Sequence, residues 1–144
     1  ALALLARMPR VGLVPNTVSY SAAIGACEKA AQWRLALGLL AHMPCLGLEP
    51  NIISYNAAIS ACGNAARWRP ALGLLAQMPH AGLEPDTVSH NAAVSACEKA
   101  AHWRLAVDRL AQMPRAGLEP NAISYNAAIS TCEKAGQWRL ALDI

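Results

Sequence analysis

The feature that most constrains this chain is a period of 35 residues that runs from one end to the other. Cysteines mark it at positions 27, 62, 97 and 132, and tryptophans mark it at 33, 68, 103 and 138. A short repeat cannot bury its own apolar side, so it must stack against its neighbours. The sequence therefore predicts a tandem array rather than a domain with one central core.

The residue pattern of each repeat predicts two helices joined by a short turn. In the first repeat, one apolar stripe at helical spacing comprises Tyr20, Ala23, Ile24 and Cys27. A break at residues 30–32 separates it from a second helix over Trp33–Met43, which Pro44 and Gly47 end. Two stacked helices per repeat predict an all-α, right-handed solenoid.

The repeats are counted from the first residue of each first helix. On this count the chain comprises a partial repeat at 1–16, complete repeats at 17–51, 52–86 and 87–121, and a partial repeat at 122–144. The array then starts and stops inside a second helix, so we expect a fragment of a longer array. Apolar surface exposed at both ends would favour self-association there.

Two local features follow from helix-end chemistry. The residue before each first helix is predicted to be its N-cap, and these residues are Asn16, Asn51, Asp86 and Asn121. Pro70 lies in the first turn of its helix, where no intrahelical donor is needed, so we expect it to be tolerated.

The composition limits the classes of function. The chain is 55% hydrophobic and 15% charged with a net charge of +3, which suits packed helices and is compatible with a nucleic-acid partner without requiring one. No apolar run approaches the roughly 18 residues of a membrane span, so we expect a soluble protein with no membrane partner. The start, Ala1–Leu5, lacks a basic leader and is not expected to be a targeting peptide.

A polar residue recurs inside each first helix, at the fifth position of the repeat: Ser21, Asn56, Asn91 and Asn126. Asn is less favourable than Ala in a helix by roughly half a kcal/mol, so its recurrence needs a reason. The position lies away from the apolar stripe, and stacked repeats would align these side chains along one concave groove.

The motif Tyr-Asn-x-x-Ile-x-x-Cys, followed by an Ala- and Leu-rich helix and then Met-x-x-x-Gly-Leu-x-Pro-Asn/Asp, resembles the pentatricopeptide repeat. Tetratricopeptide repeats have a period of about 34 and a Trp-Leu-Gly-Tyr signature that is missing here. The resemblance covers the whole chain. It implies single-stranded RNA binding at one base per repeat, in a chloroplast or mitochondrion, with no cofactor and no small-molecule substrate.

The resemblance also implies which residues read the bases. They are the fifth-position residues Ser21, Asn56, Asn91 and Asn126 and the last-position residues Asn51, Asp86 and Asn121. By the family's associations, Ser21/Asn51 reads A, Asn56/Asp86 reads U, Asn91/Asn121 reads C or U, and Asn126 suggests a pyrimidine. The implied RNA is 5′-A-U-(C/U)-(C/U)-3′. The alternative is that these residues only cap helices, although both roles can coexist at the last position.

The resemblance also implies RNA contacts for two further sets of residues. The second-position residues Val18, Ile53, Val88 and Ile123 would sandwich the bases, with ordinary core packing as the alternative. The thirteenth-position residues Lys29, Lys99 and Lys134 would contact phosphates, with a solvated surface charge as the alternative. Asn64 interrupts this second row.

Other repeated residues are expected to be structural. One cysteine per repeat does not supply the paired spacing of a metal site, so Cys27, Cys62, Cys97 and Cys132 are predicted to be buried and Cys45 exposed. The absence of a pairing pattern fits a reducing compartment. The tryptophans are expected to pack rather than stack on bases, and the arginine after each of them to be solvated.

No catalytic centre is evident, because the four histidines occupy unrelated places and nothing resembles a nuclease or deaminase site. We therefore expect no enzymatic activity and no metal in this chain. Two rival functions are a protein-binding scaffold of the tetratricopeptide type and an architectural spacer. Neither gives a reason for Ser, Asn and Asp to recur at the fifth and last positions.

Overall fold

The computed structural model describes residues 2–143, with side chains for all of these except Leu2, Trp138 and Leu140. The packing expected of Trp138 and the end of the last helix at residue 144 therefore lie outside the described residues. Within residues 2–143 every regular element is helical, which confirms the predicted all-α solenoid.

The first helices of the repeats are four helices of equal length: α2 (Thr17–Lys29), α4 (Ile52–Asn64), α6 (Thr87–Lys99) and α8 (Ala122–Lys134). The second helices are α3 (Trp33–His42), α5 (Trp68–Gln77) and α7 (Trp103–Gln112), with α1 (Leu2–Arg7) and α9 (Trp138–Asp143) in the same role at the two ends. A 3₁₀ turn follows each of α1, α3, α5 and α7: η1 (Pro9–Val11), η2 (Pro44–Leu46), η3 (Pro79–Ala81) and η4 (Pro114–Ala116).

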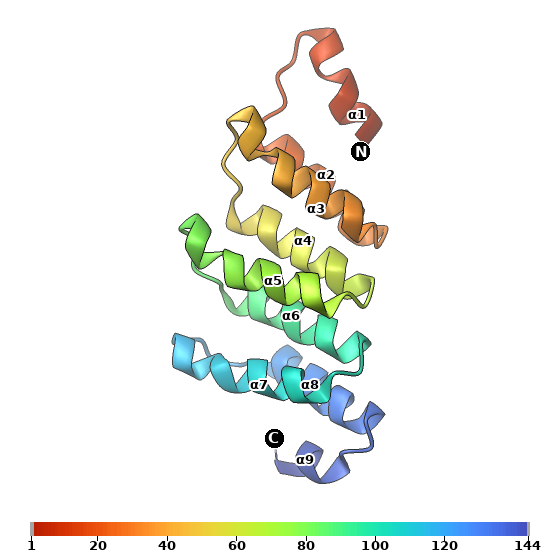
Figure 1. Ribbon diagram of the computed structural model, residues 1–144, viewed down its shortest axis with the longest axis vertical. Helices are drawn as coiled ribbons and strands as arrows, with labels where there is room; N and C mark the ends of the chain where they lie inside the picture. The colour runs from red at the N-terminus through yellow and green to blue at the C-terminus, as the bar shows by residue number, and fades with distance from the viewer. Residues whose placement is uncertain (1, 144) are drawn as a thin grey trace.

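The helical hairpins stack along the long axis of the molecule, from α1 at one end to α9 at the other (Figure 1). First helices pack on first helices, α2 on α4, α4 on α6 and α6 on α8, and each second helix packs on the first helix of its own and of the following repeat. Among the helices of residues 2–143, no second helix packs directly on another. The first helices therefore form a continuous inner layer that carries the fifth-position residues.

Small side chains allow this close packing of first helices. Ala61 and Ala96 are fully buried, and a Cβ on Gly63 would lie 3.4 Å from the backbone oxygen of Ala92 and 3.5 Å from the Cβ of Ala96. The space between α4 and α6 is thus already filled by backbone and methyl groups.

The cysteines lie where the sequence predicts. Cys27, Cys62, Cys97 and Cys132 are buried and Cys45 is exposed, and all five are free thiols. Burial raises the pKa of Cys62 and of Cys97 to about 11, so both thiols stay protonated at neutral pH.

The turn inside each hairpin is a Schellman motif. In the second repeat, the Arg67 N–H donates to the Cys62 carbonyl at 2.8 Å and the Ala66 N–H donates to the Gly63 carbonyl at 2.9 Å. Ala66 adopts a left-handed conformation with φ of 55°, and Ala31, Ala101 and Gly136 do the same at this position. The break predicted at residues 30–32 is therefore a defined helix end.

The second helices end as predicted. Met43 caps α3, Pro44 opens the 3₁₀ turn, and Gly47 follows with φ of 70°. Pro70 is the third residue of α5, and α5 is ten residues long, like α3, so the predicted tolerance of this proline is confirmed.

The third repeat departs from its neighbours at the fourth position. His90 replaces the buried tyrosine of the first two repeats and is itself buried, and its Nδ1 has no hydrogen-bond partner among the described residues. Burial lowers the pKa of His90, the Arg109 guanidinium lowers it further, and Asp86 opposes the effect. The neutral imidazole is the form this site favours.

Candidate nucleic-acid interface

The predicted N-caps are confirmed at all four first helices. Asn16, Asn51, Asp86 and Asn121 each accept a hydrogen bond from the backbone N–H of the serine three residues later. Each serine completes a capping box by accepting from the backbone N–H of its cap residue.

The capping serines are Ser19, Ser54, Ser89 and Ser124, and none of them is among the residues predicted above. The signal was available, because they recur every 35 residues and each stands three residues after a cap. Ser54, Ser89 and Ser124 are fully buried.

The fifth-position and last-position residues of one repeat contact each other directly. Asn56 Nδ2 donates to Asp86 Oδ1 at 3.3 Å, and Asn91 Nδ2 donates to Asn121 Oδ1 at 3.2 Å. In each case the partners are 30 residues apart in sequence and lie on successive first helices. Capping alone does not account for these bonds, so the last position combines capping with a contact to the fifth position.

The first and last of the four fifth-position residues make no such contact within residues 2–143. Ser21 has a buried hydroxyl with no hydrogen-bond partner among the described residues, and Asn51 serves only its capping box. Asn126 is exposed at the edge of the array. The structure thus brings together two of the predicted base-reading pairs through direct hydrogen bonds.

The carboxylate of Asp86 is held in its charged form. Burial works to raise its pKa, but hydrogen bonds from the Ser89 N–H, the Ser89 hydroxyl and the Asn56 amide outweigh burial and lower the pKa below its usual value. Asp86 therefore presents a negative charge at neutral pH.

The predicted base-sandwiching residues form an exposed apolar row beside the caps. The exposed fractions are 73% for Val18, 62% for Ile53, 59% for Val88 and 63% for Ile123. Each is the second residue of a first helix, two positions after the cap. Such exposure argues against the alternative that these side chains belong to the core.

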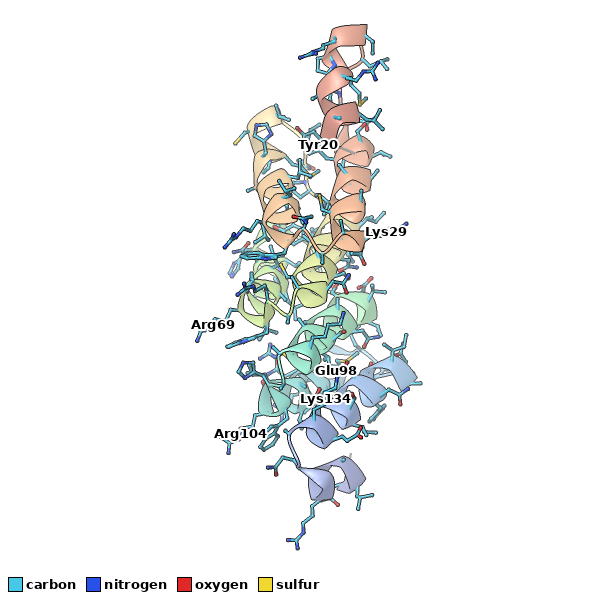
Figure 2. The ribbon with its side chains drawn as sticks, turned by 90° about the vertical axis from the view of Figure 1, so that its right-hand side faces the viewer. Tyr20, Lys29, Arg69, Glu98, Arg104 and Lys134 are labelled. Carbon is cyan, nitrogen blue, oxygen red and sulfur yellow. The ribbon has the colours of Figure 1, made fainter. Side chains whose placement is uncertain are left out.

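The predicted phosphate contacts are linked to neighbouring repeats. Lys99 Nζ donates to Asn64 Oδ1 at 2.7 Å, and Asn64 Nδ2 donates to the Glu28 carbonyl at 3.1 Å. Lys134 Nζ lies 2.9 Å from Glu98 Oε1, side by side in Figure 2. Lys29 is exposed and has no such partner among residues 2–143. Their contact with phosphate stays a prediction.

Trp33, Trp68 and Trp103 pack against neighbouring side chains. Arg69 and Arg104, each of which follows one of these tryptophans, lie on the opposite side of the molecule from Lys29 (Figure 2). The Trp33 ring has the Arg34 guanidinium at 5.1 Å and the Arg67 guanidinium at 5.3 Å from its centroid. Trp33 and Trp68 also pack on the core cluster. This agrees with the predicted packing role for the tryptophans.

Residues 2–143 contain neither a metal-binding cluster nor a helix suited to a membrane. No group of three or more His, Cys, Asp or Glu side chains there is arranged to hold a metal ion. No described helix combines the length and the apolar character needed to cross a membrane.

Family profiles decide the classification. The profile of the PPR repeat family matches residues 15–64 and 50–99, and the PPR repeat profile matches residues 123–144. The chain belongs to the pentatricopeptide repeat family. No curated protein sequence matches the chain significantly.

Solved pentatricopeptide repeat structures share the fold. PPR10 from maize matches with 29% identity and a TM-score of 0.76 over 90% of this chain and 18% of its own. PPR10 in complex with an 18-nt psaJ RNA element matches with 20% identity and a TM-score of 0.87 over 99% of this chain and 21% of its own.

A second relative is similar over most of its solved chain. The PPR domain of Arabidopsis thaliana protein-only RNase P 1, in complex with tRNA, matches with 16% identity and a TM-score of 0.79. The match covers 99% of this chain and 77% of that domain. Against PPR10, by contrast, this pentatricopeptide array spans about a fifth of the solved length.

Proposed function

We propose that this chain binds single-stranded RNA at one nucleotide per repeat, with 5′-A-U-(C/U)-(C/U)-3′ as its core target. The observation that carries the proposal is the hydrogen-bonded pair of Asn56 and Asp86, which joins the fifth and last positions of one repeat. Solved relatives in complex with an RNA element and with tRNA support the class of ligand. A protein-binding scaffold gives no reason for such a pair.

The atoms left free at each pair are suited to a pyrimidine edge. Asn56 Nδ2 uses one hydrogen on Asp86 Oδ1 and keeps a second, while Asp86 Oδ2 has no partner among the described side chains. A donor beside an acceptor complements a uracil carbonyl beside its N3–H. This chemistry supports uracil opposite the second repeat.

The third repeat offers a different combination. Asn121 Oδ1 accepts from the backbone N–H groups of Ile123 and Ser124, at 3.0 and 3.2 Å, and from Asn91 Nδ2. Asn91 and Asn121 therefore both turn N–H donors outward. Cytosine presents two neighbouring acceptors to such a pair, and uracil presents a carbonyl to one of them, so the third repeat is assigned C or U.

The exposed second-position residues give each base an apolar wall. The flat face of a base would contact Val18, Ile53, Val88 or Ile123, and its edge would reach the polar pair beside them. Lys29, Lys99 and Lys134 would approach the phosphates at the far end of each first helix. The chain thus supplies separate groups for base faces, base edges and backbone.

The chain acts by binding and contributes no catalysis of its own. We place it in a chloroplast or mitochondrion, where it would take part in RNA processing, stabilisation or editing. The free thiols suit a reducing compartment. Because the chain spans about a fifth of the PPR10 structures, any further activity of the whole protein would depend on other segments.

Fluorescence anisotropy with labelled eight-nucleotide RNAs tests the proposal. An RNA containing AUCU should bind more tightly than a purine run of the same length, and binding of both should weaken with added salt. Equal affinities for the two RNAs would contradict sequence-specific reading.

A further inference from the structure

We propose that Ser89 and Ser124 are positioning residues that fix the side-chain amide of the base-reading asparagine in the preceding repeat. The inference rests on the proposed function, since it assigns what sets the specificity of that site. Each serine would hold its asparagine so that the N–H₂ group, and not the carbonyl, faces the groove.

The geometry is the same at two repeat boundaries. Ser89 Oγ donates to Asn56 Oδ1 at 2.6 Å and shares the same proton with Asp86 Oδ1 at 2.8 Å. Ser124 Oγ donates to Asn91 Oδ1 at 2.5 Å and lies 3.2 Å from Asn121 Oδ1, so in both cases the asparagine oxygen is the nearer acceptor. Both serines are fully buried, so water does not compete for these bonds. The asparagine, the last-position residue and the serine of the next repeat form a closed ring of hydrogen bonds.

The chemistry of the partners fixes the direction of each amide. A carboxylate only accepts hydrogen bonds, so the Asn56 atom facing Asp86 must be the nitrogen and the atom facing Ser89 must be the oxygen. At the next boundary, the Asn121 oxygen is identified by the backbone N–H groups that it accepts. The Asn91 atom facing it is therefore the nitrogen, and Ser124 must donate to the Asn91 oxygen.

The first repeat provides a natural control. Its fifth-position residue, Ser21, has no amide to orient, and Ser54 instead donates its hydroxyl to the backbone carbonyl of Asn51 at 2.7 Å. Ser54 has the same burial and the same capping box as Ser89. The two serines differ in whether the hydroxyl holds a base-reading side chain.

Removing the Ser89 hydroxyl would leave Asn56 Oδ1 without its donor. The amide would then be held only through its nitrogen, by Asp86, and its second N–H would no longer be fixed toward the uracil carbonyl. The preference for uracil over cytosine opposite the second repeat should fall by about fivefold, the equivalent of one ordinary hydrogen bond. Capping would weaken equally in Ser89→Ala and Ser54→Ala.

The test compares Ser89→Ala with Ser54→Ala on RNAs containing AUCU and ACCU, by fluorescence anisotropy. Ser89→Ala should lower the U-to-C affinity ratio, and Ser54→Ala should leave it at the value of the unaltered chain. Circular dichroism melting curves of both variants show whether the array stays folded. An unchanged ratio in folded Ser89→Ala, or an equal loss in Ser54→Ala, would overturn the inference.

A measurement on the RNA-free protein separates this inference from the proposed function. Hydrogen exchange of the Asn56 side-chain amide, followed by NMR, should be faster in Ser89→Ala than in Ser54→Ala. Equal exchange rates would reject the positioning role even if RNA binding is established. Failure of the unaltered chain to bind any RNA would reject the proposed function while the exchange result still decides the role of Ser89.

Discussion

At the scale of the residue, the last position of the second and third repeats contacts two helices at once. Asp86 Oδ1 accepts from the Ser89 N–H at 2.8 Å, which caps α6, and also from Asn56 Nδ2 on α4. The hydrogen bond that caps α6 therefore also fixes the position of the Asp86 carboxylate, which faces the groove. If Asp86 reads a base as we propose, its fixed side chain loses little further entropy on binding.

Asn56→Thr is predicted to change the base read by the second repeat from U to G. The shorter hydroxyl side chain leaves room for a purine, and the Asp86 carboxylate can accept from the N1–H and amino groups of guanine. Anisotropy with AUCU and AGCU measures the switch. Loss of binding to every RNA in a folded variant would show that the role assigned to Asn56 is wrong.

His90 should make stability depend on pH. The folded pKa lies below the ordinary 6.5, so the unfolded chain takes up a proton first as the pH falls. This contribution to stability is present above about pH 6.5 and is lost as the pH drops through the folded pKa. His90→Tyr, which installs the residue of the first two repeats, should reduce the loss of melting temperature between pH 7.5 and pH 5.

An equal decrease in the melting temperatures of the unaltered chain and of His90→Tyr would assign the pH dependence to other groups. Arg109 and Asp86 are the charged groups that act on His90, and both remain in this variant.

At the scale of the element, the left-handed alanine of each hairpin turn is a local weakness. Ala66 has φ of 55°, a conformation that disfavours any side chain with a Cβ, and Gly136 occupies the same place in the last repeat. Ala66→Gly should raise the free energy of unfolding by about 1 kcal/mol, measured by urea denaturation.

The neighbouring Ala65 supplies the control for that prediction. Its φ of −94° suits alanine, so Ala65→Gly should bring no gain and a small loss. Equal effects of the two substitutions would mean that the turn does not strain Ala66.

The helices and their caps could be predicted from the sequence, because the helical periodicity and the proline that precedes each Asn or Asp cap are local signals. The left-handed alanines could not, since alanine is a poor residue for φ above zero and only the packing of the two helices imposes it. The hydrogen bond between Ser89 and Asn56 spans 33 residues and needs the stacked repeats to be seen. The exposure of Val18 and its equivalents likewise depends on which neighbour covers each helix.

At the scale of the whole molecule, stability is a sum over contacts between neighbouring repeats. Ala96 is fully buried where α6 meets α4, so Ala96→Leu should overpack that interface and lower the free energy of unfolding by about 1–3 kcal/mol. Ala26 holds the same position in the first repeat and is exposed. Ala26→Leu should therefore be nearly neutral in the same urea titration.

If Ala26→Leu lowered the free energy of unfolding as much as Ala96→Leu, the effect would arise within the helix and not at the interface between repeats. With only neighbour contacts, the Ala96→Leu transition should also broaden, because the two sides of the altered interface can unfold separately.

The ring of asparagine, cap and serine also bears on how such arrays can change in length. The boundaries at the second and third repeats both join a fifth-position asparagine to a serine of the next first helix, with Asp86 or Asn121 as the cap between them. Tandem duplication or loss of one 35-residue block would place a cap and a serine of the same kinds at the new boundary. The hydrogen bonds there would then be those of the existing boundaries. Under the proposed function, recombination within the gene could therefore lengthen or shorten the recognised RNA by one nucleotide while leaving the fold intact.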